Sequence, residues 1–155
     1  MHAGPALIKP RIFIDADVLL SGSASPYENS ASLVLLRMGE ITLIEALTSD
    51  QVITEVTRNL AEKMPNGLAA FSFLVRKSLQ VVPDPAIAEL EPFWGKADPK
   101  DLPILVAALR ENCSFLATFN VRHFKPDYGS LTVLKPGDLV VRIRYLLSHL
   151  GGKWQ

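Results

Sequence analysis

Short apolar runs alternate with helical stretches along this chain, and this alternation constrains its fold more than any other feature. The runs are rich in β-branched residues and too short for helices, which is typical of strands buried in a sheet. The expected strands cover residues 12–14, 41–44, 79–82, 114–118 and 131–134. Strands that alternate with helices in this way predict an α/β domain.

Helical stretches separate these runs, and several begin or end at a recognisable break. A loop rich in Ser, Gly and Pro over residues 21–26 leads into the first predicted helix, which Gly39 closes. Thr48 and Gln51, three residues apart, resemble a capping box that opens a second helix. The predicted helices cover about 30–38, a segment after 48 with the apolar stripe Val52, Val56 and Leu60, 68–77, a segment from 101 or 102, and 136 to about 149.

The chain has 155 residues, enough for one domain to bury its core without a disulfide or a structural metal. We expect an N-terminal extension at 1–10, one domain over 11–149 and a short tail at 150–155. The single cysteine, Cys113, is expected to be a small buried side chain.

Charge and hydropathy give little indication of a partner. Sixteen basic and sixteen acidic residues cancel, so no overall charge points to a nucleic acid or a membrane. The first ten residues lack the apolar core of a signal peptide, and no run approaches the about 20 apolar residues of a membrane span. We therefore expect a cytoplasmic protein.

Two acidic residues, Asp15 and Asp17, follow the first predicted strand directly. Ligands of open α/β sheets bind in the crevice outside the carboxyl ends of the strands, so Asp15 is expected to face a ligand. Apolar residues continue at 18–20, which places both acids inside buried structure. Because a buried carboxylate is unfavourable unless it is paired, and hard oxygen ligands suit Mg²⁺ or Mn²⁺, a divalent metal is a fitting partner.

Further polar residues that suit such a site come later in the chain. Asp98 and Asp101 precede Pro103, which is tolerated only in the first turn of a helix, so both are expected at a helix N-terminus. An Asp there is also a common capping residue. Glu55 lies on the flank of its helix's apolar stripe, where a Glu is usually solvated. The order of these residues, with Asn120 last, therefore carries more information than any one of them.

This order resembles that of the PIN domain, a fold of metal-dependent nucleases that includes the VapC-like toxins of bacterial toxin-antitoxin pairs. Four segments, within residues 11 to 147, carry the resemblance. They are Phe13-Ile-Asp15-Ala-Asp17-Val-Leu-Leu-Ser21, similar to the family's usual Asp-Thr-Asn-Val-Leu; Val52-Ile-Thr-Glu55-Val56; Asp98-Pro-Lys-Asp101-Leu-Pro; and Leu116-Ala-Thr-Phe-Asn120-Val-Arg-His-Phe124, similar to one toxin subgroup. The resemblance implies a single three-layer domain with a central parallel sheet of about four to five strands flanked by helices.

The resemblance also implies an activity, that of a metal-dependent endoribonuclease that hydrolyses RNA phosphodiester bonds. One or two Mg²⁺ or Mn²⁺ ions would be held by Asp15, Asp98, Asp101 and Glu55, the last through a water molecule. Asp15, Glu55, Asp101 and Asn120 would be the catalytic residues, and Asp17 would support the ligands. An antitoxin partner and a homodimer are further implications of the resemblance.

The chain departs from the family's pattern at two positions. Asp17 stands where Asn is commoner, and Asn120 stands where many PIN nucleases have a fourth Asp, which puts a second metal in doubt. The cationic residues that follow, Arg122, His123 and Lys125, would contact RNA phosphates, or form a solvated loop.

Two other functions remain open. An apolar strand followed by Asp-x-Asp also begins the haloacid dehalogenase-like phosphatases, in which Asp15 would be the nucleophile and Asp17 its acid/base partner. That family expects its later acids after another strand, whereas Asp98 and Asp101 open a helix. A PIN-like module that binds RNA or a protein without cleaving is the second alternative, and Asn120 is its support.

Overall fold

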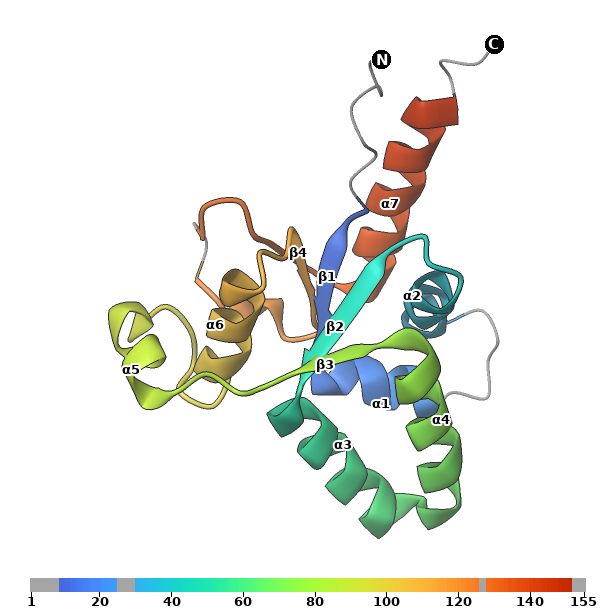
Figure 1. Ribbon diagram of the computed structural model, residues 1–155, viewed down its shortest axis with the longest axis horizontal. Coiled ribbons are helices and arrows are strands. Elements are labelled where there is room, and N and C mark those ends of the chain that lie inside the picture. Colours follow the sequence, from blue (N-terminus) through green and yellow to red (C-terminus); the bar gives the residue numbers. More distant parts are fainter. Residues whose placement is uncertain (1–8, 25–29, 126–127, 152–155) are drawn as a thin grey trace, which may run out of the picture.

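The computed structural model describes residues 9–24, 30–125 and 128–151, and in them the chain forms one parallel five-stranded sheet (Figure 1). The strand order is β3-β2-β1-β4-β5, and every neighbouring pair is parallel. The strands are β1 (Arg11–Ile14), β2 (Glu45–Ser49), β3 (Gln80–Val82), β4 (Phe115–Ala117) and β5 (Thr132–Leu134). The predicted α/β class and parallel sheet are therefore confirmed.

Helices cover both faces of this sheet. The α-helices of the described residues are α1 (Ala16–Ala24), α2 (Ala31–Glu40), α3 (Asp50–Lys63), α4 (Leu68–Ser78), α5 (Ile87–Leu90), α6 (Leu102–Arg110) and α7 (Pro136–Gly151). Helix α2 packs against α1, α4 and α7. Helix α6 lies on the opposite side of the sheet from α2, with α5 against it (Figure 1). The domain thus has the three layers expected of it.

The core is built around the central strand β1. Ile12, Phe13 and Ile14 have no exposed surface, because helices cover both faces of a strand that also has a neighbour on each side. Leu105 of α6 and Leu35 of α2 are equally buried. Asp15, the residue that follows β1, is therefore attached to a strand with three fully buried side chains.

The chain changes direction across the sheet between β1 and β4. From β1 it proceeds outward to β2 and β3 on one side, and then returns to form β4 and β5 on the other. The backbone N–H of Asp15 still donates to the carbonyl of Ala117, at 3.0 Å, so the two strands end together. This is the topological switch point at which open α/β sheets bind their ligands.

The predicted loop at 21–26 is wrong over residues 21–24. Ser21–Ala24 belong to α1, which begins directly after Asp15, and residues 25 and 26 lie outside the described residues. The small residues at these positions do not form a turn. They allow α1 to pack closely against α2. A Cβ on Gly22 would lie 2.7 Å from Leu36 of α2.

The second predicted strand, 41–44, is also wrong, because β2 is displaced toward the C-terminus. Ile41 and Leu43 are 63% and 41% exposed, and Thr42 has a positive φ of 63° that is typical of a turn. The apolar run continues to Leu47, and pairing with β1 selects its later part, with Arg11 opposite Glu45.

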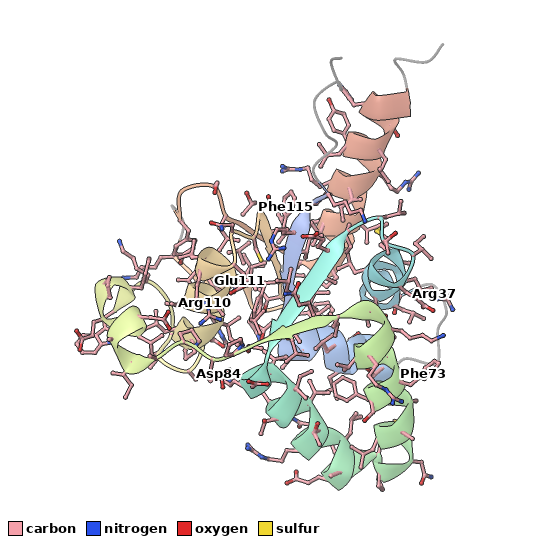
Figure 2. The ribbon with its side chains drawn as sticks, in the orientation of Figure 1. Arg37, Phe73, Asp84, Arg110, Glu111 and Phe115 are labelled. Atoms are coloured by element: carbon pink, nitrogen blue, oxygen red, sulfur yellow. The ribbon has the colours of Figure 1, made fainter. Side chains whose placement is uncertain are left out.

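The predicted capping box at Thr48 is wrong for the same reason. Thr48 lies in β2, where its hydroxyl donates to the carbonyl of Ile14 at 2.9 Å. Ser49 caps α3 instead, accepting from Val52 N–H at 3.5 Å. The side chain of Asp84 also binds the N-terminus of this helix, because it accepts from Gln51 N–H at 2.9 Å (Figure 2).

Two differences at other helices are smaller. Helix α5 was not predicted, and α7 extends to Gly151 rather than ending near 149. Residues 1–8 and 152–155, which hold most of the predicted extension and tail, lie outside the described residues, so the division of the chain stays a prediction. No helix of the described ranges has the length and apolar character needed to cross a membrane.

Candidate functional site

Asp15 is buried at the carboxyl end of β1 and is held by two donors. Its exposed fraction is 7%. One carboxylate oxygen, Oδ1, accepts from the N–H of Ala16 at 2.7 Å, and Oδ2 accepts from the hydroxyl of Thr118 at 2.9 Å. Burial, followed by the charge of Asp17, raises the pKa of Asp15 from 3.8 to about 6. These two hydrogen bonds fix the orientation of the Asp15 carboxylate. They do not fully offset the unfavourable burial of its negative charge.

Asp17 lies in the first turn of α1 and reaches across to the segment after β4. Its Oδ2 accepts from the N–H of Phe119 at 3.0 Å and from the side-chain amide of Asn120 at 3.1 Å. Its Oδ1 is buried and has no well-aligned hydrogen bond among the described residues, although the backbone N–H of Val18 lowers the pKa of the carboxyl. Burial is the main reason why the pKa of Asp17 is raised. Hydrogen bonds thus hold Oδ2 of Asp17 in place, whereas Oδ1 has no well-aligned hydrogen bond among the described residues.

Thr118 connects these two acids. It is fully buried, its hydroxyl donates to Asp15, and the same oxygen accepts from the N–H of Asn120 at 3.1 Å. The sequence predicted no role for Thr118, although this residue opens the Thr-Phe-Asn motif that directly follows β4. A polar residue at the end of the strand next to β1 was the available signal.

A second group of side chains lies at the N-terminus of α6. His123 Nδ1 is 2.8 Å from Asp101 Oδ2 and 3.6 Å from Asp98 Oδ2, and one ligand atom from each of the three lies within 4.8 Å of the others. The N–H of Asp98 donates to the carbonyl of His123 at 2.9 Å, which joins the two loops. Asp101 is 8% exposed, whereas Asp98 is exposed. Carboxylate and imidazole donors in this arrangement suit a divalent cation.

The two groups belong to one acidic region, which we call the acidic cluster: Asp15, Asp17, Asp98 and Asp101. Burial is the main cause of the raised pKa values of Asp15 and Asp17, and the negative charge of Asp101 adds a smaller contribution to each, so Asp101 lies within electrostatic range of both. Within the described part of the chain, neither Asp15 nor Asp17 forms an ion pair with a Lys, Arg or His. Buried negative charge without a cation, together with the orphaned Oδ1 of Asp17, fits a metal ion.

Glu55 is not brought into contact with the acidic cluster. It is exposed on α3, where it lines an open pocket of about 580 Å³ with Gln51, Thr54, Arg58, Asn59 and Asp84. Gln51, one turn earlier, donates its side-chain amide to the carbonyl of Lys100 at 3.3 Å. The first turn of α3 is thus joined to the loop that carries Asp98 and Asp101, with Glu55 one turn further along.

The three residues predicted to contact phosphate, Arg122, His123 and Lys125, do not all line the same pocket. Arg122 and His123 line a pocket of about 290 Å³ beside Asn120. Lys125 lines a different pocket, of about 530 Å³, which Arg122 also borders. Only His123 is bound to acidic residues, namely Asp98 and Asp101.

Comparison with known proteins identifies the family of this chain. The family model of the PIN domain matches residues 11–122. The acidic cluster lies on the fold that this family defines, and the chain belongs to the PIN domain family.

Solved structures show the same fold. Fifteen chains match, one of them from the crystal structure of VapBC2 from Rickettsia felis bound to a DNA fragment from their promoter. It is similar to this chain with a TM-score of 0.57 and 15% identity, over 81% of this chain and 98% of that chain. Identity this low shows the fold alone. No match is found among curated proteins.

Proposed function

We propose that this protein is a metal-dependent endoribonuclease that hydrolyses RNA phosphodiester bonds and acts as the toxin of a toxin-antitoxin pair. The observation that carries the proposal is the acidic cluster at the switch point between β1 and β4, in which Asp15 is buried and, among the described residues, one oxygen of Asp17 has no well-aligned hydrogen bond. Membership of the PIN family and the fold shared with a chain of VapBC2 support it.

The donor set fits one or two Mg²⁺ or Mn²⁺ ions. Asp15, Asp98 and Asp101 would bind metal directly, and Glu55 would hold a metal-bound water. A bound ion would lower the pKa of water and neutralise charge on the scissile phosphate. His123 already contacts Asp98 and Asp101, so it either joins the ligands or must move aside when metal binds.

The remaining residues of the site position these ligands and the substrate. Thr118 fixes the orientation of Asp15, and Asn120 fixes that of Asp17. Arg122, His123 and Lys125 would contribute phosphate contacts, because cationic side chains dominate sequence-independent affinity for RNA.

Metal binding gives the first test. Calorimetric titration of Mn²⁺ should show binding to the wild type that Asp15→Asn or Asp101→Asn abolishes. Glu55→Gln should weaken binding, and Glu62→Gln on the same helix is the matched control because both carboxylates are exposed. Equal affinity in the wild type, Asp15→Asn and Asp101→Asn would contradict the proposal.

RNA cleavage and toxicity give the second test. With Mn²⁺, the wild type should cut single-stranded RNA and Asp101→Asn should not. Expression in bacteria should arrest growth, and Asp101→Asn should relieve the arrest. An antitoxin that blocks the site, a homodimer and action in the cytoplasm belong to the same proposal, and co-purification with a small partner would support the first of these.

Asn120 gives a specific reason to consider a module that binds RNA without cutting it. It is uncharged at a position where many relatives have an acid, and its amide is committed to Asp17. A protein that binds Mn²⁺ and RNA but leaves all tested RNAs intact would favour this function. Membership of the PIN family favours the nuclease and the RNA-binding module over a phosphatase. Hydrolysis of an aryl phosphate that Asp17→Asn abolishes, with RNA left uncut, would reverse that preference.

A further inference from the structure

A pocket lined by positively charged side chains adjoins the acidic cluster. We call it the basic pocket; it has a volume of about 290 Å³ and is lined by Phe119, Asn120, Val121, Arg122, His123 and Lys135. Two of its residues also contact the acids, because Asn120 donates to Asp17 and His123 lies 2.8 Å from Asp101. The pocket and the acidic cluster are therefore parts of one continuous surface.

Strand order explains why Lys135 belongs to this pocket. The N–H of Thr118 donates to the carbonyl of Leu134 at 3.1 Å, so β4 and β5 end side by side. Lys135 is the next residue after Leu134, at the same edge of the sheet as Asp15 and Asn120. Within the described residues, neither Lys135 nor Arg122 forms an ion pair, and both are exposed. Two exposed positive charges, without an ion pair in the part of the chain that the structure describes, thus line the pocket that adjoins the acids.

Phe119 adds an aromatic surface to these charges. Its side chain is 44% exposed, so the hydrophobic core does not account for its position. Its backbone is nevertheless fixed, because its N–H donates to Asp17 at 3.0 Å. An exposed ring on a fixed backbone is suited to stacking against a flat ligand.

We infer that the basic pocket binds the nucleotide next to the scissile phosphate of single-stranded RNA, with Lys135 and Arg122 on a phosphate and Phe119 stacked on the base. The inference rests on the proposed function and names how the same site takes its substrate. Cations bind the phosphate backbone of any sequence, and aromatic rings stack on every base. The pocket therefore favours unpaired nucleotides without strong sequence preference.

The test measures the affinity of a short, fluorescently labelled single-stranded RNA in EDTA, where no cleavage occurs. Lys135→Ala and Arg122→Ala should each weaken binding about tenfold, and each should reduce the salt slope of log K by about 0.7, as expected for one lost phosphate contact on a single strand. Phe119→Ala should weaken binding about tenfold with no change in salt slope. These side chains are exposed, and unchanged melting temperatures confirm that the variants fold.

Matched controls separate the pocket from general charge effects. Lys63→Ala removes an exposed charge at the end of α3 and should leave the affinity unchanged. Lys125→Ala should weaken binding less than Lys135→Ala, because Lys125 lines a different pocket. A larger loss from Lys125→Ala would overturn the inference. So would an equal loss from Phe119→Ala with duplex RNA, in which paired bases cannot stack on the ring.

Further outcomes distinguish this inference from the proposed function. If the wild type cuts RNA with Mn²⁺ while Lys135→Ala and Phe119→Ala change neither the affinity nor KM, the nuclease stands and the basic pocket does not. If those variants lose affinity for RNA that the wild type never cuts, the pocket stands and the nuclease does not. Unchanged RNA affinity combined with lost binding of an acidic peptide would assign the pocket to a protein partner and overturn the inference.

Discussion

The side-chain amide of Asn120 donates a hydrogen bond to Oδ2 of Asp17 at 3.1 Å, across 103 residues of sequence. In the sequence resemblance, the position of Asp17 more often carries an amide and that of Asn120 an acid. This chain therefore has the same two functional groups in exchanged positions, and they remain in contact. The negative charge missing at position 120 is present on α1 instead.

Reversal of the exchange tests whether the two residues act as a pair. Asn120→Asp alone puts a second carboxylate against Asp17 and removes a donor, so it should lower the free energy of unfolding of the metal-free protein by about 1–2 kcal/mol at pH 7. The double variant Asp17→Asn with Asn120→Asp should recover most of this loss, because it restores one amide and one carboxylate. Urea unfolding in EDTA measures both. A double variant no more stable than Asn120→Asp would show that the contact is not a pair interaction.

Cys113 should be chemically inert in the folded protein. It is 3% exposed between α6 and β4, and burial raises the pKa of its thiol to about 12. Almost no thiolate, the reactive form, is then present at pH 8. Ellman's reagent should react with Cys113 in urea and not in buffer, and Cys113→Ala should retain RNA cleavage. Rapid reaction of the folded protein would show that this part of the core opens.

The sequence predicted those parts of the fold that a strong local pattern determines. Val52, Val56 and Leu60 recur at helical spacing, and all three are buried on α3. Pro103 indicated where α6 begins, and the structure has its first residue at Leu102. The strand at 41–44 was wrong because an apolar run does not define its own ends, and the pairing of β1 with Glu45–Leu47 selects them.

For the candidate site, too, the sequence predicted only what a local pattern determines. The sequence predicted acids at the end of β1 and at the start of α6, because each follows a local signal. It gave no indication that Asp17 would bind Asn120, or that Thr118 would join both acids, because those contacts depend on which strands become neighbours. Lys135 was missed for the same reason, since it reaches the site only through the pairing of β5 with β4.

Thr118 should matter through its hydroxyl rather than its size. Thr118→Val keeps the shape of the side chain but removes the donor to Asp15 and the acceptor for the N–H of Asn120. The pKa of Asp15 should rise further, and the free energy of unfolding should fall by about 1–3 kcal/mol, the usual result of leaving buried polar groups unpaired. Thr118→Ser is the control, because it keeps the hydroxyl, and it should preserve the pKa. NMR titration of the Asp15 carboxyl carbon measures the effect, and equal pKa values in Thr118→Val and the wild type would contradict it.

The metal-free protein should lose stability with rising pH through Asp15. The folded-state pKa, about 6, lies above the reference value of 3.8, so the folded protein holds the proton more tightly than the unfolded chain does. The contribution of this group is therefore most favourable below about pH 4, and declines between about pH 4 and 6. It is about 3 kcal/mol less favourable above that range, since one pKa unit corresponds to about 1.4 kcal/mol.

Comparison with Asp15→Asn isolates this contribution, because the variant keeps the other titrating groups. In EDTA, the stability of the variant relative to the wild type should be about 1 kcal/mol greater at pH 7 than at pH 5, as measured by urea unfolding. Mn²⁺ should raise the melting temperature of the wild type at pH 7 and leave that of the variant unchanged, because a cation that binds ionised Asp15 removes the reason for its instability. If the free energies of unfolding of the two proteins change in parallel with pH, Asp15 has the same pKa in the folded and unfolded chains. Burial would then not destabilise its ionised form, and a metal ion would not be needed to offset it.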